Sequence, residues 1–157
     1  MPARGQAGTL LVVLLLSACG SGGGRLSKAD YEQRVQKILP QAASKILKTR
    51  LAIERARSPG AERRSLDELQ RDARAVADDL DRLEPPREIA APHANLVAAL
   101  RRVSAAAGGI RRKIKGRDTS AAQAAGQRLE AGPEFEKIAT ALEAIIAKGY
   151  ELGLPSK

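Results

Sequence analysis

The chain has few residues that carry redox, metal or aromatic chemistry. Its 157 residues include one Cys, one Met, one His and no Trp, and aromatic residues make up only 2% of the total. A single cysteine cannot form an internal disulfide, and one histidine cannot supply the several donors that a zinc, copper or haem site requires. The sequence also contains no Asp-x-Asp-x-Asp-Gly calcium loop and no phosphate-binding glycine loop. We therefore expect no metal and no cofactor, and we expect that the protein is not an enzyme.

The scarcity of aromatic residues leaves the core to be built from Leu, Ile, Val and Ala. This composition, together with abundant Arg and Glu, favours helices over strands. A length of 157 residues is typical of one domain that can bury a core. We therefore expect an all-α, single-domain protein.

The first eighteen residues have the pattern of a secretory leader. One basic residue, Arg4, precedes an apolar run over residues 10–16. Seven residues span only about 10 Å as a helix, which is too short to cross a bilayer. Leu16-Ser17-Ala18-Cys19 follows directly and resembles the lipobox of bacterial lipoproteins, Leu-(Ser/Ala)-(Ala/Gly)-Cys, at every position.

This resemblance implies that residues 1–18 are removed as a signal peptide and that a diacylglycerol is attached to the sulfur of Cys19. The mature protein would then be lipid-anchored at the extracytoplasmic face of the cell membrane by at least two acyl chains, which suffice for stable anchoring. Residues 19–26 would form a glycine-rich tether, in which the Gly/Ser run 20–24 reaches about 12 Å. The alternatives are an ordinary secretory signal or a buried cysteine.

Four helical patterns follow the tether. The first begins at a Ser27 cap and extends to about Arg57, the second begins at a Ser65–Glu68 capping box, the third opens near Pro86, and the fourth is capped by residues 118–120. We expect a kink or two abutting segments at Pro40, a bend or break at Gly132-Pro133, and a C-cap at Gly149.

Each pattern carries an apolar stripe at helical spacing. The inward positions are Tyr31, Val35, Ile38, Ala42, Ile46 and Ile53; Leu66, Leu69, Ala73, Val76, Leu80 and Leu83; Ile89, His93, Leu96, Leu100, Val103, Ala107, Ile110 and Ile114; and Ala122, Ala125, Leu129, Ile138, Leu142 and Ile145, with Phe135 nearby. Short connections between four such helices predict an up-and-down antiparallel bundle over residues 27–152, followed by a loose tail over 153–157.

A second, shorter resemblance lies within this region. Leu83-Glu84-Pro85-Pro86, followed by His93-Ala94-Asn95-Leu96, is similar to a stretch in small uncharacterised helical lipoproteins of high-G+C Gram-positive bacteria. The resemblance covers about a dozen residues and implies no activity.

The charge of the chain is strongly positive and unevenly distributed. The net charge is +9, and removal of Arg4 with the leader would leave 26 basic and 18 acidic side chains, a net +8. Residues 101–117 hold seven bases and no acid. In an antiparallel bundle the basic residues that would gather at the pole away from Cys19 are Arg55, Arg57, Arg63, Arg64, Arg111, Arg112, Lys113, Lys115 and Arg117, of which all but Arg55 are candidate binding residues.

This basic pole predicts an anionic partner, either a wall polymer or an acidic protein. Nucleic acid is the weakest candidate because no aromatic residue interleaves the bases to stack on them. The alternative is that the bases only compensate the negative ends of helix dipoles.

Two further patterns indicate candidate pockets. His93, Tyr31 and Tyr150 are predicted to share the anchored pole and to line a small polar pocket, although His93 also fits a buried histidine satisfied by hydrogen bonds. Bends at Pro40 and Gly132-Pro133 are predicted at similar heights and would open a lateral cleft, unless the two bends merely pack together. The second pattern favours a small-molecule carrier as the alternative function, and an enzyme that uses His93 is a third hypothesis.

Overall fold

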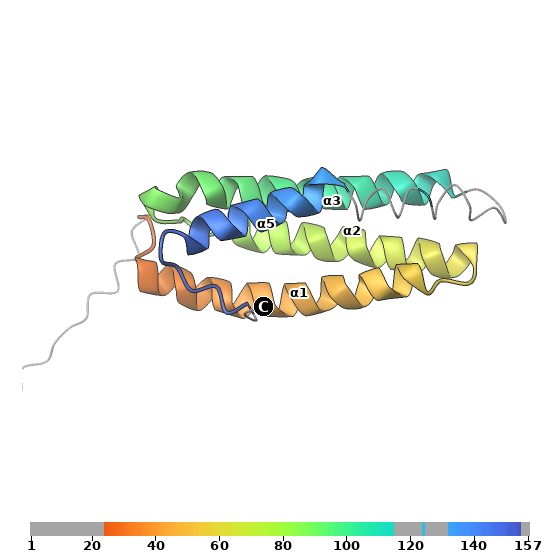
Figure 1. Cartoon of the computed structure of the whole chain (residues 1–157), viewed down its shortest axis with the longest axis horizontal. Coiled ribbons are helices and arrows are strands. Elements are labelled where there is room, and N and C mark those ends of the chain that lie inside the picture. The colour runs from red at the N-terminus through yellow and green to blue at the C-terminus, as the bar shows by residue number, and fades with distance from the viewer. Residues whose placement is uncertain (1–23, 115–123, 125–131, 155–157) are drawn as a thin grey trace, which may run out of the picture.

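Every regular element in the described part of the chain is helical. The computed structural model describes residues 24–114, 124 and 132–154. The elements are α1 (Lys28–Glu54), α2 (Pro59–Asp81), the 3-10 helix η1 (Arg87–Ile89), α3 (Ala90–Lys113) and α5 (Pro133–Ile146). Helices α1, α2 and α3 lie side by side with consecutive helices running in opposite directions, and α5 packs against α3 (Figure 1). The predicted all-α class is confirmed for these residues.

Serine side chains fix where the first two helices begin. Ser27 Oγ accepts a hydrogen bond from the backbone N–H of Asp30 at 3.2 Å, as the sequence predicts for α1. Helix α2 is capped in the same way by Ser58, whose Oγ accepts from the N–H of Ala61 at 3.2 Å. The predicted start of α2 at Ser65 is therefore wrong. Ser58-Pro59 begins the helix earlier because proline at the first helical position has its backbone already in the helical conformation.

The two proline positions have different outcomes. Helix α1 runs as one continuous helix through Pro40, which excludes the second of the two predicted alternatives, two abutting segments. The first alternative, a kink at Pro40, stays a prediction. Pro40 lacks an N–H and thus removes one hydrogen bond to the carbonyl of Gln36, a loss that the packing of the flanking turns outweighs. At the second position α5 begins at Pro133, and its N-cap Gly132 has an extended backbone, so the helix does not continue through the position where a bend or break is predicted. The segment predicted before it lies outside the described residues, except for residue 124. The predicted fourth-helix start at 118–120 lies outside the described residues.

The core consists of two clusters along the helices. The cluster at the end where α1 begins is centred on fully buried residues of several helices, among them Tyr31, Val35, Leu80, Ile89, Leu96 and Ile145. The second cluster lies toward the end of α3 and contains Leu66, Leu69, Ala73, Val103, Ala107, Ile110 and Ile114. The predicted stripes of α2 and α3 are buried throughout. In the stripe of α1, Ile38, Ile46 and Ile53 are only partly buried, and Leu39 and Thr49 are buried in addition.

The segment after α5 packs along α1. Gly149 has a φ of +80°, so the chain turns there in the conformation that glycine adopts without strain. The backbone N–H of Glu151 then donates to Glu32 Oε1 at 2.9 Å, and Gln36 Nε2 donates to the carbonyl of Glu151 at 3.1 Å. Leu152 is only 3% exposed. The segment therefore holds the end of the chain against α1, where Figure 1 shows it in dark blue.

The beginning of the described chain is held at the connection between α2 and α3. The N–H of Leu26 donates to the carbonyl of Glu84 at 2.8 Å, and Arg25 Nη1 donates to the carbonyl of Pro85 at 3.1 Å. The chain thus enters the helices at the pole where α1 begins, which we call the entry pole.

Candidate functional site

The predicted basic residues gather where α1 ends, α2 begins and α3 ends. Arg63 of α2 donates a hydrogen bond to the carbonyl of Ile114, and Arg111 Nε of α3 lies 3.1 Å from Asp67 Oδ1 of α2. These contacts join the ends of two helices at the pole opposite the entry pole. We call the described bases at this pole the basic tip: Arg57, Arg63, Arg64, Arg111, Arg112 and Lys113. Lys115 and Arg117, also predicted for this site, lie outside the described residues.

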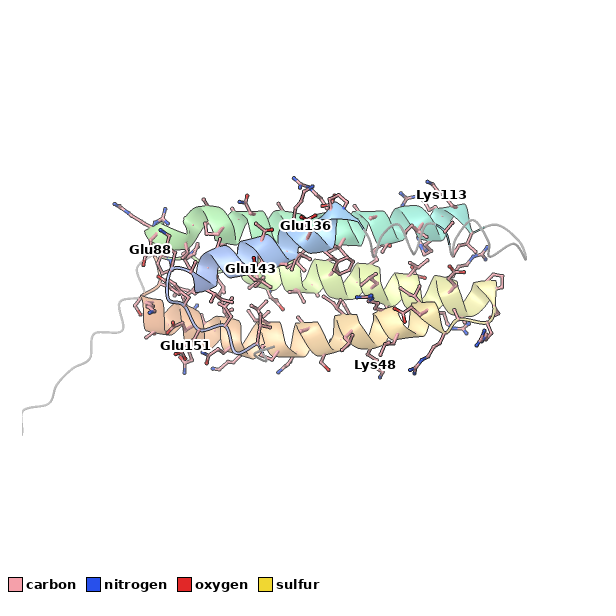
Figure 2. The ribbon with its side chains drawn as sticks, viewed as in Figure 1. Lys48, Glu88, Lys113, Glu136, Glu143 and Glu151 are labelled. Atoms are coloured by element: carbon pink, nitrogen blue, oxygen red, sulfur yellow. The ribbon has the colours of Figure 1, made fainter. Side chains whose placement is uncertain are left out.

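The bases of the tip differ in whether they have partners. Arg63 and Arg111 are engaged by the contacts above. Within the described part of the chain, no hydrogen bond or ion pair engages the side chains of the other four, which are all exposed: Arg57, Arg64, Arg112 and Lys113. Figure 2 shows Lys113 directed away from α3 and its neighbours.

Most bases elsewhere on α2 and α3 are paired with acids, whereas Arg71 donates only to the backbone carbonyl of Asp67. Arg101 Nη2 lies 2.8 Å from Asp81 Oδ2 and 3.6 Å from Asp78 Oδ1, and Arg82 Nη1 lies 2.8 Å from Asp79 Oδ1. These pairs lie toward the entry pole. In the described residues, the tip therefore has more bases without an acidic partner than the rest of these two helices.

Acidic residues near the tip compensate only part of its charge. Glu68 of α2 is exposed and lines the same surface depression as Arg64. Asp67 is already held by Arg111. Glu62, in the first turns of α2, is 2% exposed, and burial raises the pKa of its carboxyl group because the charged form is poorly hydrated there.

The second predicted group, at the entry pole, forms a packed cluster. Tyr31 Oη lies 2.9 Å from His93 Nδ1, and the two rings meet edge to face with centroids 5.6 Å apart. Tyr150 packs on the other side of Tyr31 with centroids 5.7 Å apart. All three side chains are buried, so they fill the space that they were predicted to line. We call Tyr31, His93 and Tyr150 the Tyr–His cluster.

The hydrogen bonds of His93 define its protonation state. Its Nε2 lies 3.1 Å from the carbonyl oxygen of Leu80, which can only accept, so Nε2 carries the proton. Nδ1 then accepts from the hydroxyl of Tyr31. Burial lowers the pKa of His93 below its ordinary value of 6.5, despite the opposing effects of the Leu80 carbonyl and Asp81. His93 is therefore a neutral structural residue with both ring nitrogens occupied.

Tyr150 links the cluster to the surface. Its hydroxyl donates to Glu88 Oε1 at 2.6 Å, and Lys28 Nζ lies 5.3 Å from the centroid of its ring. Burial, reinforced by the hydrogen bond to Glu88, raises the pKa of Tyr150 to about 12. The same hydrogen bond lowers the pKa of Glu88. These interactions attach the segment after α5 to η1 and α1, which is a structural role.

A shallow depression reaches His93 from outside. It has a volume of about 320 Å³, and its lining includes Arg25, Asp81, Pro85 and His93. The residues of the second resemblance, 83–86 and 93–96, lie around this part of the entry pole. Glu84 and Pro85 supply the carbonyls that hold Leu26 and Arg25, so their observed contacts are structural.

A groove between α3 and α5 is the nearest counterpart of the predicted lateral cleft. Its volume is about 440 Å³, and its lining includes Pro92, Ala98, Arg102, Pro133 and Ala144. Pro133 borders this groove, as the prediction of a cleft at Gly132-Pro133 requires. Pro40 does not line it, so the groove is not formed between the two predicted bends.

The described residues offer no alternative site of metal or membrane-spanning type. Among residues 24–114, 124 and 132–154, no three His, Cys, Asp or Glu side chains come together as metal ligands would. Nor does any helix in these ranges combine the length and apolar character needed to cross a bilayer. Comparison with protein-family models, curated proteins and solved structures gave no match.

Sequence reasoning located the tip but missed which of its bases are engaged. It also missed the groove between α3 and α5 and the packing of Leu152 against α1. The pairing of Arg101 with Asp81 and of Arg111 with Asp67 depends on how α2 and α3 face each other across their interface. No signal along the chain reports that geometry.

Proposed function

We propose that this protein is a lipid-anchored, extracytoplasmic four-helix up-and-down bundle that binds an anionic envelope component or an acidic protein through its basic tip. It acts as a non-enzymatic binding or accessory module. The observation that carries the proposal is the contrast between the tip, where Arg57, Arg64, Arg112 and Lys113 are exposed and without described partners, and the paired bases nearer the entry pole.

The location of the anchor gives the tip its orientation. The lipobox resemblance places a lipid on Cys19, and the described chain enters at the entry pole through Arg25 and Leu26. Helix α1 has 27 residues and is therefore about 40 Å long. An upright molecule would present the tip about that far from the membrane surface, where it meets partners other than the anchoring bilayer.

Anchoring is tested by Cys19→Ala. The wild-type chain should be found in the membrane fraction. Its N-terminal peptide should have the mass expected after cleavage before Cys19 and diacylation of that cysteine. The variant should lose both properties. An intact leader on a freely soluble wild-type chain would contradict this part of the proposal.

Binding is tested with poly-L-glutamate of about twenty residues, a soluble polyanion of defined length. The tip variant is Arg64→Glu/Arg112→Glu/Lys113→Glu. The control is Arg74→Glu/Arg82→Glu/Arg87→Glu, which changes the net charge equally but lies toward the entry pole. We expect the tip variant to bind at least about tenfold more weakly than the control. The tip variant loses the bases that contact the carboxylates of the peptide, whereas the control changes only the net charge. Equal affinities would contradict the proposal.

The groove between α3 and α5 supports a second candidate function, that of a small-molecule carrier. Its volume of about 440 Å³ lies within the range of small-molecule sites. Ala144, an exposed residue of its lining, can be replaced by Trp to fill it. A carrier would show ligand uptake that is insensitive to salt and lost in Ala144→Trp, whereas binding at the tip would be unchanged in that variant.

A further inference from the structure

A row of basic residues runs along the outer side of α1 toward the tip. Arg34, Lys37, Lys45, Lys48 and Arg55 are all exposed. At about 100° per residue these positions fall within an arc of about 80°, and they extend over about 32 Å of the helix. Figure 2 shows Lys48 on the side of α1 that faces away from the other helices. We call these five residues the α1 stripe.

The charges of the stripe are not compensated on their own helix. Between Glu32 and Glu54, α1 contains no acidic residue. The ion pairs of α1 are at its two ends, Lys28 with Glu32 and Arg50 with Glu54. In the described ranges, no ion pair or hydrogen bond engages the side chain of any of the five stripe residues. This contrasts with the paired bases of α2 and α3.

The stripe is continuous with the basic tip. Its last member, Arg55, is the C-cap residue of α1, and Arg57 of the tip follows two residues later. One anionic molecule of sufficient length can therefore contact both. A compact ligand bound at the tip would leave the stripe unoccupied.

The shape and composition of the stripe favour one kind of ligand. Protein interfaces concentrate their binding energy in a buried apolar or aromatic centre surrounded by a polar rim. Gln41 and Ala52 occupy the positions between the bases of the stripe, and the exposed Leu47 and Leu51 lie on the neighbouring ridge of α1 instead of between the bases. A flexible chain of regularly spaced anions needs no apolar centre, since it gains affinity by releasing counterions at each contact. The lack of aromatic residues gives nucleobases nothing to stack on.

We propose that the partner of this protein is a linear polyanion that lies along the α1 stripe and continues onto the basic tip. This inference rests on the proposed function, because it treats the tip as one end of the same binding site.

Two lengths of poly-L-glutamate test this inference with the full chain in detergent. Five residues reach at most about 18 Å and twenty reach about 70 Å, so only the longer peptide can cover the stripe and the tip together. The stripe variant is Lys37→Glu/Lys45→Glu/Lys48→Glu, which matches the tip variant in its change of charge. Circular dichroism checks folding, and Lys37→Gln/Lys45→Gln/Lys48→Gln replaces the stripe variant if it does not fold.

We expect the wild type to bind the longer peptide at least about tenfold more tightly than the shorter one. The stripe variant should lose this preference and keep its affinity for the shorter peptide, and the tip variant should weaken both. If the stripe variant binds the longer peptide as the wild type does, the inference is wrong, although the tip variant still tests the proposed function. If neither peptide binds the wild type, the proposed function fails as well.

An exposed apolar pair beside the stripe allows a membrane surface to be distinguished from a soluble polyanion. Leu47 is 56% exposed and Leu51 is 37% exposed, and both lie on the neighbouring ridge of α1. Leu47→Gln/Leu51→Gln should leave polyglutamate binding unchanged, and vesicles of anionic lipid should bind wild type and this variant equally. Vesicle binding that depends on the two leucines, combined with weak binding of polyglutamate, would overturn the inference in favour of a membrane surface.

Discussion

His93 shows how both ring nitrogens of a buried histidine can be satisfied by hydrogen bonds from two different helices. Tyr31 from α1 donates to one ring nitrogen, and the other donates to a carbonyl at the end of α2. A protonated ring would carry a hydrogen on Nδ1, so the hydroxyl of Tyr31 could no longer donate to it. The arrangement therefore stabilises the neutral ring and joins three helices at the entry pole.

Removing the hydroxyl of Tyr31 should destabilise the fold measurably. Tyr31→Phe leaves Nδ1 of His93 buried without its donor, and an unsatisfied buried acceptor costs about 1–3 kcal/mol. Urea denaturation at neutral pH should show a loss in this range. Tyr150→Phe is the matched control, because Glu88 at the surface can bind water instead and the loss should be smaller. Equal losses would show that the contact with His93 has no special value.

The stability of the protein should also depend on the state of His93. The folded-state pKa is below 6.5, so the unfolded chain binds more protons at acidic pH. The contribution of neutral His93 to the free energy of unfolding is present above about pH 6.5 and is lost as the pH falls through the folded-state pKa. The titratable groups that face His93 are Tyr31 of α1 and Asp81 of α2, and Asp81 opposes the shift.

His93→Gln isolates this effect, because glutamine can still hydrogen-bond but does not titrate. The unfolding free energy should fall more for the wild type than for the variant when the pH is lowered from about 7.5 to about 5. The carboxylates common to both chains contribute equally and cancel in the comparison. Parallel changes in the two chains would contradict a neutral, buried His93.

At the scale of the elements, helix α2 shows how local signals compete. Ser65 and Glu68 match a capping box, yet Ser58 caps the helix and Ser65 is buried within it. Pro59 accounts for the earlier start. Its fixed backbone angle suits the first turn of α2, and its missing N–H prevents α1 from continuing past this position. The connection between α1 and α2 is consequently only four residues, 55–58.

Two serine substitutions distinguish these helix starts. Ser58→Ala should cost about 1 kcal/mol, because the N–H of Ala61 loses its acceptor. Ser65→Ala should cost less or stabilise, since alanine is the better helix former inside a helix. The two unfolding free energies, measured by chemical denaturation, provide the check. A larger loss for Ser65→Ala would place the effective cap at Ser65.

Much of the helical architecture could be predicted because burial repeats at helical spacing. The stripes of α2 and α3 follow directly from such local patterns. The predicted C-cap at Gly149 is wrong by two residues, because α5 ends at the C-cap Ala147 and Gly149 forms the turn that follows. Pro40 was harder, because the cost of proline is local whereas the gain from packing both halves of α1 is not. The engaged and unengaged bases of the tip could not be separated from sequence, because Arg63 and Arg111 find their partners across helix interfaces.

At the scale of the whole molecule, the two poles have different roles in the proposed function. The entry pole contains the Tyr–His cluster and the contacts that hold Arg25 and Leu26, so its chemistry is directed inward. The opposite pole presents bases to solvent (Figure 2). The arrangement fits a molecule that is fixed at one end and binds at the other, with the α1 stripe between them.

The salt dependence of polyglutamate binding tests the role of the tip most directly. The logarithm of the association constant falls linearly with the logarithm of the salt concentration, with a slope of roughly 0.7 per neutralised charge on a single-stranded polyanion. We predict that Arg64→Glu/Arg112→Glu/Lys113→Glu reduces the magnitude of this slope by about two relative to the wild type, because three contacts are lost. The charge-matched control at Arg74, Arg82 and Arg87 should keep the wild-type slope. Identical slopes for all three proteins would contradict binding at the basic tip.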